Sequence, residues 1–236
     1  MMKWLATFLI FLLMLDLRAS AEGLTVYPTS LVLDEARRVG VLTLVNQGGE
    51  EAIYELAGYR WTEADGADHL IPDKAFIVTP PVVTLAPGEQ RVVRVGVLAG
   101  GAPLAVEQAY RVRVSELHSG DLSRGNALDV RLQILLPVFL GGGSRDLDLG
   151  FSAEENQDGQ LCLEGLNSGD SHARLVWVAP AGHPEKKTPI HKYMLAKSSA
   201  RFCVDPVAKP GGKVSVGATS IYQSDVQSFL TDIAVP

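Results

Sequence analysis

The sequence has few cysteines, few aromatic residues and no concentration of positive charge. Its 236 residues include only 2 Cys, and Phe, Trp and Tyr together make up 7%. The formal net charge is −6 and no Lys/Arg cluster offsets it, so nucleic acid is not an expected partner. After residue 21 no apolar run approaches the roughly 20 residues of a membrane-spanning helix. We therefore expect no membrane insertion of the chain that follows residue 21.

Motifs that carry catalysis or phosphate binding are also missing. There is no G-x-S-x-G nucleophile elbow, no H-E-x-x-H and no phosphate-binding G-x-x-x-x-G-K-[ST]. The glycine run 141–143 does not lead into a helical pattern, so it provides no helix N-terminus for an anion. The five histidines all lie in polar or turn-like surroundings: His69, His118, His172, His183 and His191. Metal binding by His183 and His191, eight residues apart in a proline-containing loop, is the alternative to the favoured interpretation of solvated loop histidines. We expect no enzyme, no cofactor and no metal site.

The first residues have the pattern of a secretory signal peptide. Lys3 precedes an apolar run from Trp4 to Leu15, and a small-x-small site follows at Ala19-Ser20-Ala21. The apolar run is too short to span a bilayer as a helix. We predict that residues 1–21 are cleaved and that the mature chain works outside the cytoplasm. An uncleaved anchor is the alternative.

The two cysteines, Cys162 and Cys203, form an even pair, which favours one disulfide in an oxidising compartment. Each lies in a short strand-like run, as expected for a bridge between neighbouring strands. Closing a loop of about 42 residues would stabilise the fold by roughly 4 kcal/mol in the chain-entropy description. A redox-active pair is the alternative, but no C-x-x-C spacing supports it. We predict a structural disulfide.

The rest of the chain is predicted to be all-β. Short runs of β-branched and apolar residues recur between turn residues, and about seven or eight such runs fall within residues 24–140, at the spacing of a sandwich. The stretch 141–144 (Gly-Gly-Gly-Ser) is a Gly-rich hinge between domains. We predict two immunoglobulin-like β-sandwich domains, an N-terminal one over 22–140 and a C-terminal one over 145–236.

One predicted strand, within residues 126–137, has an unusually long alternating pattern. A period of two places its apolar side chains on one face. Such a strand either closes the core of its own domain or is offered to a partner, and that choice decides the function. The apolar positions are Leu128, Val130, Leu132, Ile134 and Leu136.

Three segments resemble the periplasmic pilus chaperones of the chaperone–usher pathway. The run 76–90, Phe-Ile-Val-Thr-Pro-Pro-Val-Val-Thr-Leu-Ala-Pro-Gly-Glu-Gln, is similar to one of that family's most recognisable segments. Residues 26–30 (Val-Tyr-Pro-Thr-Ser) resemble its first strand, and Asn126-x-Leu-x-Val-x-Leu resembles its subunit-binding strand. The run 137–139 (Pro-Val-Phe) resembles the divergent archaic branch.

The resemblance implies a periplasmic chaperone that is not an enzyme. Such chaperones cap pilus or fimbrial subunits by donor-strand complementation and deliver them to an outer-membrane usher. It implies that the five alternating side chains bind the subunit, and that Thr79–Pro80 is a cis bond. A secreted structural or adhesion module of two sandwiches is the alternative function.

The sequence departs from the family at the site that holds the C-terminal carboxylate of the subunit. Many members have an arginine and a lysine there, where Ser30 and Pro137 stand in this chain. The carboxylate clamp therefore cannot be transferred to these positions, and binding is expected to depend more on the apolar face. Four arginines are candidates for a replacement cation: Arg94, Arg111, Arg113 and Arg131.

Overall fold

The computed structural model describes residues 23–64, 66–98, 104–117, 131–141, 147–204, 211–222 and 225–235. In these ranges the chain forms seventeen strands and a single short 3-10 helix, η1 (Pro184–Lys186). The predicted all-β class is confirmed. No helix in the described ranges has the length and apolar character required to cross a membrane.

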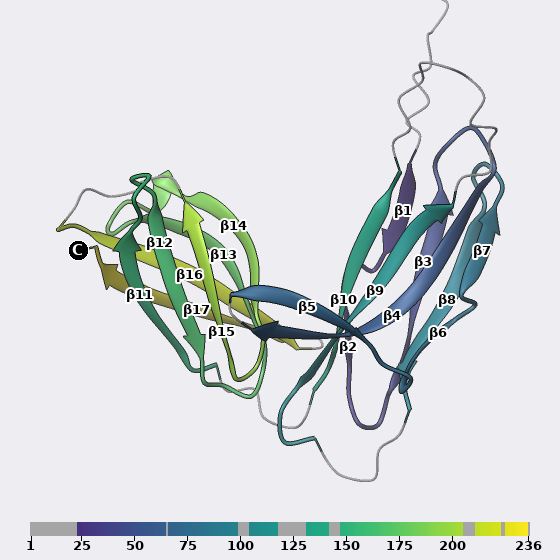
Figure 1. The fold of residues 1–236 in the computed structure, drawn as a ribbon, viewed down its shortest axis with the longest axis horizontal. Helices are drawn as coiled ribbons and strands as arrows, with labels where there is room; N and C mark the ends of the chain where they lie inside the picture. The colour runs from purple at the N-terminus through teal and green to yellow at the C-terminus, as the bar shows by residue number, and fades with distance from the viewer. Residues whose placement is uncertain are drawn as a thin grey trace, which may run out of the picture.

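The first ten strands form two facing sheets (Figure 1). One sheet has the order β1-β3-β8-β6, and the other has the order β2-β10-β9-β4-β5, with β7 also paired to β4. Their inner faces enclose a core of buried apolar side chains, including Leu42, Leu85, Val93 and Val112. The strands are β1 (Leu24–Tyr27), β2 (Leu31–Leu33), β3 (Val39–Asn46), β4 (Ala52–Ala64), β5 (Ala67–Pro72), β6 (Phe76–Thr79), β7 (Val82–Leu85), β8 (Gln90–Val97), β9 (Gln108–Leu117) and β10 (Gln133–Leu140).

The chain crosses between these two sheets twice through a proline segment. It leaves β1 for β2 after Tyr27, and it leaves β6 for β7 after Thr79. The peptide bonds Tyr27–Pro28 and Thr79–Pro80 at these crossings are both cis. Because a proline has no backbone N–H to donate to a ladder, it fits a position between strands better than one inside them.

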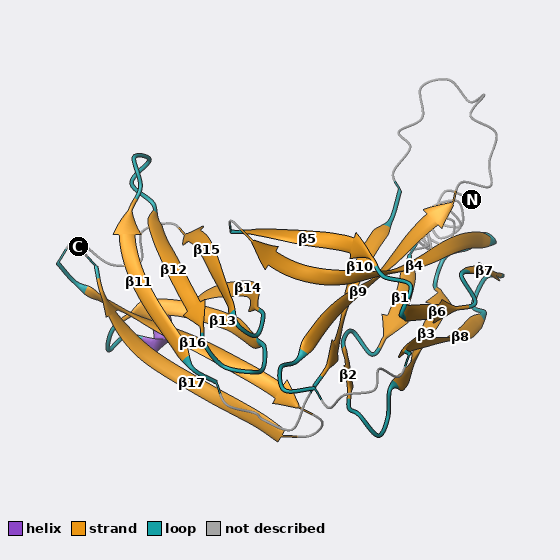
Figure 2. Cartoon of the chain, turned by 60° about the horizontal axis from the view of Figure 1, so that its bottom comes forward, coloured by secondary structure: helices purple, strands orange, loops and turns teal. Residues whose placement is uncertain are grey.

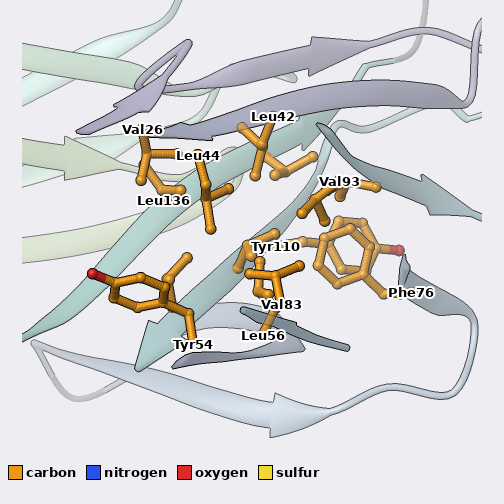
Figure 3. Close-up of a cluster of buried hydrophobic side chains, with 14 of the residues drawn as sticks. Val26, Leu42, Leu44, Tyr54, Leu56, Phe76, Val83, Val93, Tyr110 and Leu136 are labelled. Atoms are coloured by element: carbon orange, nitrogen blue, oxygen red, sulfur yellow. The ribbon is translucent and has the colours of Figure 1, made fainter. Parts of the chain in front are cut away.

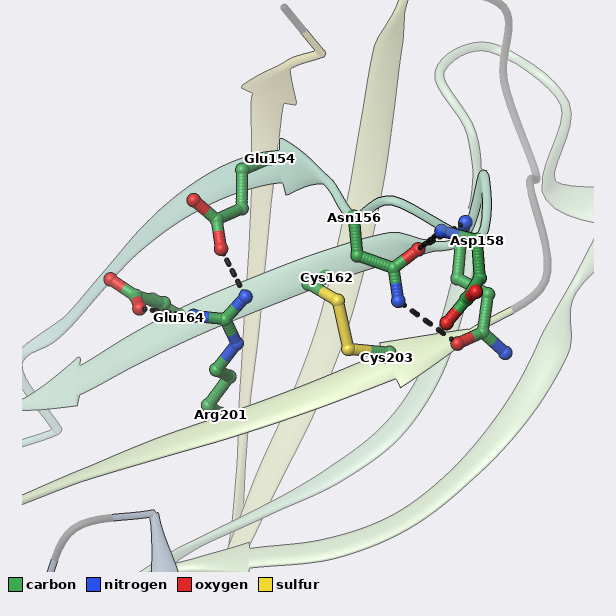
Figure 4. Close-up of a disulfide and its surroundings, with 8 residues drawn as sticks. Glu154, Asn156, Asp158, Cys162, Glu164, Arg201 and Cys203 are labelled. Carbon is green, nitrogen blue, oxygen red and sulfur yellow. Dashed lines mark hydrogen bonds and ion pairs between the residues drawn. A yellow bond between two sulfur atoms is a disulfide. The ribbon is translucent and has the colours of Figure 1, made fainter.

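The remaining strands form a second pair of sheets with a core of their own. Their orders are β11-β12-β15 and β14-β13-β16-β17. Cys162 on β12 and Cys203 on β15 face each other in register and are joined by a disulfide, which confirms the predicted bridge (Figure 4). The strands are β11 (Leu149–Glu155), β12 (Leu161–Asn167), β13 (Ala173–Pro180), β14 (Thr188–Met194), β15 (Ser198–Val204), β16 (Lys213–Tyr222) and β17 (Asp225–Ala234).

The two pairs of sheets form two lobes, and the β4–β5 hairpin extends from the first lobe to the second (Figures 1 and 2). A small third cluster of buried apolar residues lies where the lobes meet. It contains Trp61, Ala109 and Phe139 from the first lobe and Leu195 from the second. The predicted hinge falls largely within residues 142–146, which lie outside the described ranges, so the predicted domain borders stay predictions.

Candidate functional site: the open edge of β10

β10 contains the second half of the alternating pattern, and part of it is a sheet edge. Along its whole length it pairs with β9, from Gln133 opposite Ser115 to Leu140 opposite Gln108. On its other side β2 pairs in parallel with only the last three residues, Val138–Leu140. Within the described ranges, the segment 133–137 therefore has a strand on one side only.

The hydrogen-bond alternation of an antiparallel pair determines which backbone groups this edge offers. Glu116 donates its N–H to the Leu132 carbonyl at 3.0 Å, so the even-numbered residues of β10 bond to β9. Gln133, Leu135 and Pro137 then direct their backbone groups to the open side. Pro137 has no N–H to offer, and the ladder on that side can begin only before it.

The alternating side chains fall into three groups. Leu128 and Val130 lie outside the described ranges. Leu132 is half-buried, and Ile134 is half-buried against the core of the first lobe. Leu136 is 4% exposed and belongs to that core, where Figure 3 shows it near Val26 and Leu44. Burial therefore decreases along β10 toward its beginning, and in this unbound form Leu136 is not available to a partner.

The opposite face of the same sheet lines the space between the lobes. Leu135 is exposed there, at 41%, whereas Phe139 is 1% exposed and packs against the second lobe. Pro137 stands directly opposite Arg111 on β9, so the two side chains share this face. Pro137 is the position at which the resemblance to pilus chaperones led us to expect a carboxylate-binding lysine. Arg111 is thus the cross-strand neighbour of the missing cation.

Arg111 is held mainly by aromatic rings. Its guanidinium carbon is 3.5 Å from the centre of the Trp61 ring and 5.7 Å from that of Tyr193. Its nearest anion is Asp68 at 3.9 Å, and its contact with the Leu135 carbonyl is 3.5 Å long. Burial lowers the pKa of the guanidinium, against the opposing effect of Asp68. The result is a desolvated cation whose polar contacts are long.

The other candidate cations are less well placed. Arg94 is exposed on β8, which belongs to the sheet without β10. Arg113 shares the face of Arg111 but pairs with Glu55 at 3.7 Å and lies over Tyr59. Arg131 is exposed just before β10. Ser30, which stands where the resemblance leads us to expect an arginine, is exposed between β1 and β2.

His172 lies in the polar surroundings that the sequence indicates, but its side chain is buried. It is 4% exposed where the lobes meet, and its Nδ1 is 2.7 Å from Glu107 Oε1. Glu107 is also buried, at 8% exposure. The segment around His172 is polar, whereas Glu107 follows the apolar run Leu104-Ala-Val and precedes β9, and the two residues meet where one lobe packs on the other. Nothing in the sequence pattern indicated this pair.

Comparison with known proteins identifies the family. Residues 23–141, half of the chain, match the family of the pili and flagellar-assembly chaperone, PapD N-terminal domain. The chain therefore belongs to this family of PapD-like pilus chaperones, which confirms the resemblance of its sequence motifs.

Solved structures of low sequence identity share the fold of the chain. A chain of the CsuC–CsuE chaperone–tip adhesion subunit pre-assembly complex, from archaic Csu pili of Acinetobacter baumannii, is 20% identical with a TM-score of 0.68 and covers 91% of this chain and 99% of its own. A chain of the Salmonella enterica SafA pilin–SafB chaperone complex is 14% identical, with a TM-score of 0.63 and coverages of 89% and 96%. The E. coli chaperone DraB is 16% identical, with a TM-score of 0.59 and coverages of 90% and 97%. The search of curated proteins found no match.

Proposed function

We propose that the chain is a periplasmic chaperone that caps pilus subunits by donor-strand complementation and delivers them to an outer-membrane usher, with no enzymatic step. The observation that carries the proposal is the open edge of β10 between Gln133 and Pro137. The family assignment and the likeness to chains from chaperone–subunit complexes agree with it.

In this mechanism a strand of the subunit pairs along the open edge. Main-chain hydrogen bonds supply affinity, and alternate side chains enter a groove of the subunit. We assign the groove contacts to Leu128, Val130, Leu132 and Ile134. Leu136 stays in the chaperone's own core, which anchors the strand at the point where the contacts begin. Four large aliphatic side chains give on the order of 10 kcal/mol before ordering costs are subtracted.

A charge placed on the binding face tests this assignment. We expect Leu132→Glu to abolish subunit capture, because the groove would have to bury an unpaired carboxylate. The chain is co-expressed with candidate pilus-subunit genes, and a 1:1 complex is sought in periplasmic extracts by size-exclusion chromatography.

The matched control is Gln133→Glu, because the neighbouring exposed side chain lies on the opposite face. Capture by this control with none by Leu132→Glu supports the proposal, provided both variants keep the wild-type circular dichroism spectrum. A Leu132→Glu chain that loses its fold assigns the strand to the chain's own core. A wild-type chain that stays unbound favours a structural or adhesion module instead.

We also propose that Arg111 receives the C-terminal carboxylate of the subunit. It lies opposite Pro137 on the shared face. Its nearest carboxylate is 3.9 Å away, which is long for a charge-assisted contact, and a desolvated guanidinium gains most from a bidentate anion.

A test pairs Arg111→Gln with a subunit whose C-terminus is extended by two residues. If the two groups bind each other, either change weakens capture at least tenfold, and both together weaken it no further. Arg113→Gln serves as the control, because we expect it to retain the full sensitivity to the extension. Additive losses for Arg111→Gln and the extended subunit would contradict the assignment.

A further inference from the structure

Glu107, just before β9, makes three hydrogen bonds to one segment of the second lobe. Its backbone N–H donates to the Asp170 carbonyl at 2.9 Å. Its Oε1 accepts from the backbone N–H of His172 at 2.9 Å and lies 2.7 Å from the Nδ1 of the same residue. The other carboxylate oxygen is buried and has no hydrogen-bond partner among the described residues. Separating the lobes would break all three bonds at once.

The imidazole of His172 connects this contact to β10. Its ring stacks on Phe139 with the ring centres 3.5 Å apart and an angle of 6° between the planes. Tyr193 and Trp61 pack around Phe139 at 5.6 Å and 6.0 Å. Phe139 lies two residues after Pro137 on the same face of β10, the strand with the open edge. The second lobe therefore packs directly against β10, the proposed donor strand.

A second carboxylate of the first lobe makes a similar contact. Glu63, near the end of β4, has a side chain that is 1% exposed. Its Oε2 accepts from the Leu195 N–H at 2.8 Å and from the Ser198 hydroxyl at 2.5 Å. Lys192 lies 3.4 Å from its other oxygen. The hairpin that projects from the first lobe is thus attached at its far end.

One asparagine joins the two receiving segments of the second lobe. Asn167 is fully buried, and its Nδ2 donates to the carbonyls of Ser171 at 2.8 Å and Leu195 at 2.9 Å. The first carbonyl precedes His172, and the second belongs to the residue whose N–H binds Glu63. The Glu107 and Glu63 contacts therefore form a single joint rather than two independent ones.

We propose that this joint is a positioning device for subunit capture, in which Glu107 and His172 act through Phe139 to hold β10. The proposal rests on the proposed function, because it assumes that β10 binds the subunit. A strand held in its binding geometry loses less freedom on pairing, so capture is stronger. The contacts of the two buried carboxylates should form or break together, since a buried acceptor that loses its donors is strongly destabilising. By linkage, capture in turn stabilises the joint.

Four variants separate positioning from general stability. Glu107→Ala and His172→Ala remove the contact. Glu107→Gln keeps the accepting oxygen, and His172→Phe keeps the ring that stacks on Phe139. Glu51→Ala, an exposed glutamate before β4, is the control for loss of a carboxylate.

The measurements are hydrogen exchange of the Val138 and Phe139 amides and small-angle X-ray scattering of the unbound chain, then capture of the co-expressed subunit. We expect at least tenfold faster exchange, a changed scattering curve and at least tenfold weaker capture for the two alanine variants. The conservative variants and Glu51→Ala should stay near wild type. If Glu107→Ala does not accumulate, the test uses the difference in exchange, scattering and capture between His172→Ala and His172→Phe.

Three outcomes overturn the inference. The first is unchanged exchange and scattering in His172→Ala. The second is altered exchange and scattering with full capture, which leaves the proposed function intact. The third is loss in His172→Phe equal to that in His172→Ala, because the stack then has no role. If even the wild-type chain captures no subunit, the proposed function fails and the inference, which rests on it, fails with it.

Discussion

At the scale of single residues, neighbouring positions of one alternating pattern have different tasks. Leu136 is in the core of the first lobe, Ile134 packs against that core, and Leu132 is half-buried at the start of the strand. Removing a fully buried leucine costs about 2–5 kcal/mol, far more than changing a partly solvated one. Under the proposed function, the change from structural to binding residue therefore takes place between Leu136 and Leu132, along one face of one strand.

Two buried tyrosines give the first lobe a predictable response to alkali. Tyr54 and Tyr110 are 3% and 1% exposed. Burial raises the pKa of Tyr54, with a contribution from Glu116, and burial raises the pKa of Tyr110 against the opposing effect of Arg60. The folded state therefore favours the neutral phenols, whereas the unfolded chain ionises near its ordinary value of 10.0.

This stabilisation is fully present below pH 10 and is lost as the pH rises through the higher pKa values of the folded state. We expect the free energy of unfolding to fall above pH 10 by up to about 1.4 kcal/mol per pH unit for each tyrosine. Urea unfolding between pH 9 and pH 12 measures the slope. The double variant Tyr54→Phe/Tyr110→Phe should have a shallower slope, and a slope equal to that of wild type would contradict the assignment.

At the scale of elements, close contact between β4 and β6 depends on a glycine. A Cβ atom added to Gly58 would lie 2.5 Å from Phe76 Cδ1 and 3.2 Å from the Phe76 carbonyl. The Phe76 ring cannot retreat easily, because it stacks on Tyr110 with the ring centres 4.6 Å apart.

We therefore expect Gly58→Ala to lower the free energy of unfolding by about 1–3 kcal/mol through overpacking. Urea unfolding at neutral pH measures the change. Gly150→Ala on β11 is the matched control, because no atom lies within 4 Å of its added Cβ, and it should be neutral or slightly stabilising. Equal changes in the two variants would indicate that strand propensity, rather than contact with Phe76, determines the change in the free energy of unfolding.

The elements themselves were largely predictable, because short alternating runs between turn residues carry local information. The pattern around Leu132 and Leu136 predicted a strand and its apolar face correctly. It could not separate positions buried in the core from positions at the open edge, since alternation is the same in both. That distinction arises where β2 stops pairing at Val138, and such a long-range pairing leaves no mark in the strand's own sequence.

The joint was missed for a related reason. Glu107 and His172 are 65 residues apart, and no local pattern connects a single glutamate after the apolar run Leu104-Ala-Val with a histidine in a polar turn. The contact of the β4–β5 hairpin with the second lobe is also unmarked in the sequence, because the polar tip of the hairpin has the composition of an ordinary surface turn. Only the position of the second lobe turns these polar residues into buried contacts.

At the scale of the whole molecule, the disulfide and the joint belong to the same strand pair. Cys162 lies opposite Cys203, and Asn167 lies opposite Ser198 at the other end of the same ladder between β12 and β15. Asn167 and Ser198 both belong to the joint. The bridge thus closes one end of a ladder whose other end receives the first lobe.

This arrangement allows a prediction that separates stability from geometry. We expect the double variant Cys162→Ala/Cys203→Ala to lower the free energy of unfolding of the second lobe by up to about 4 kcal/mol, because the unfolded chain is no longer constrained. The seven residue pairs of the ladder remain, so the folded joint should keep its geometry. Urea unfolding should show the loss, while small-angle X-ray scattering and subunit capture in the absence of urea stay at wild-type values. A changed scattering curve with unchanged stability would instead mean that the bridge acts on the folded molecule and sets the position of the lobes.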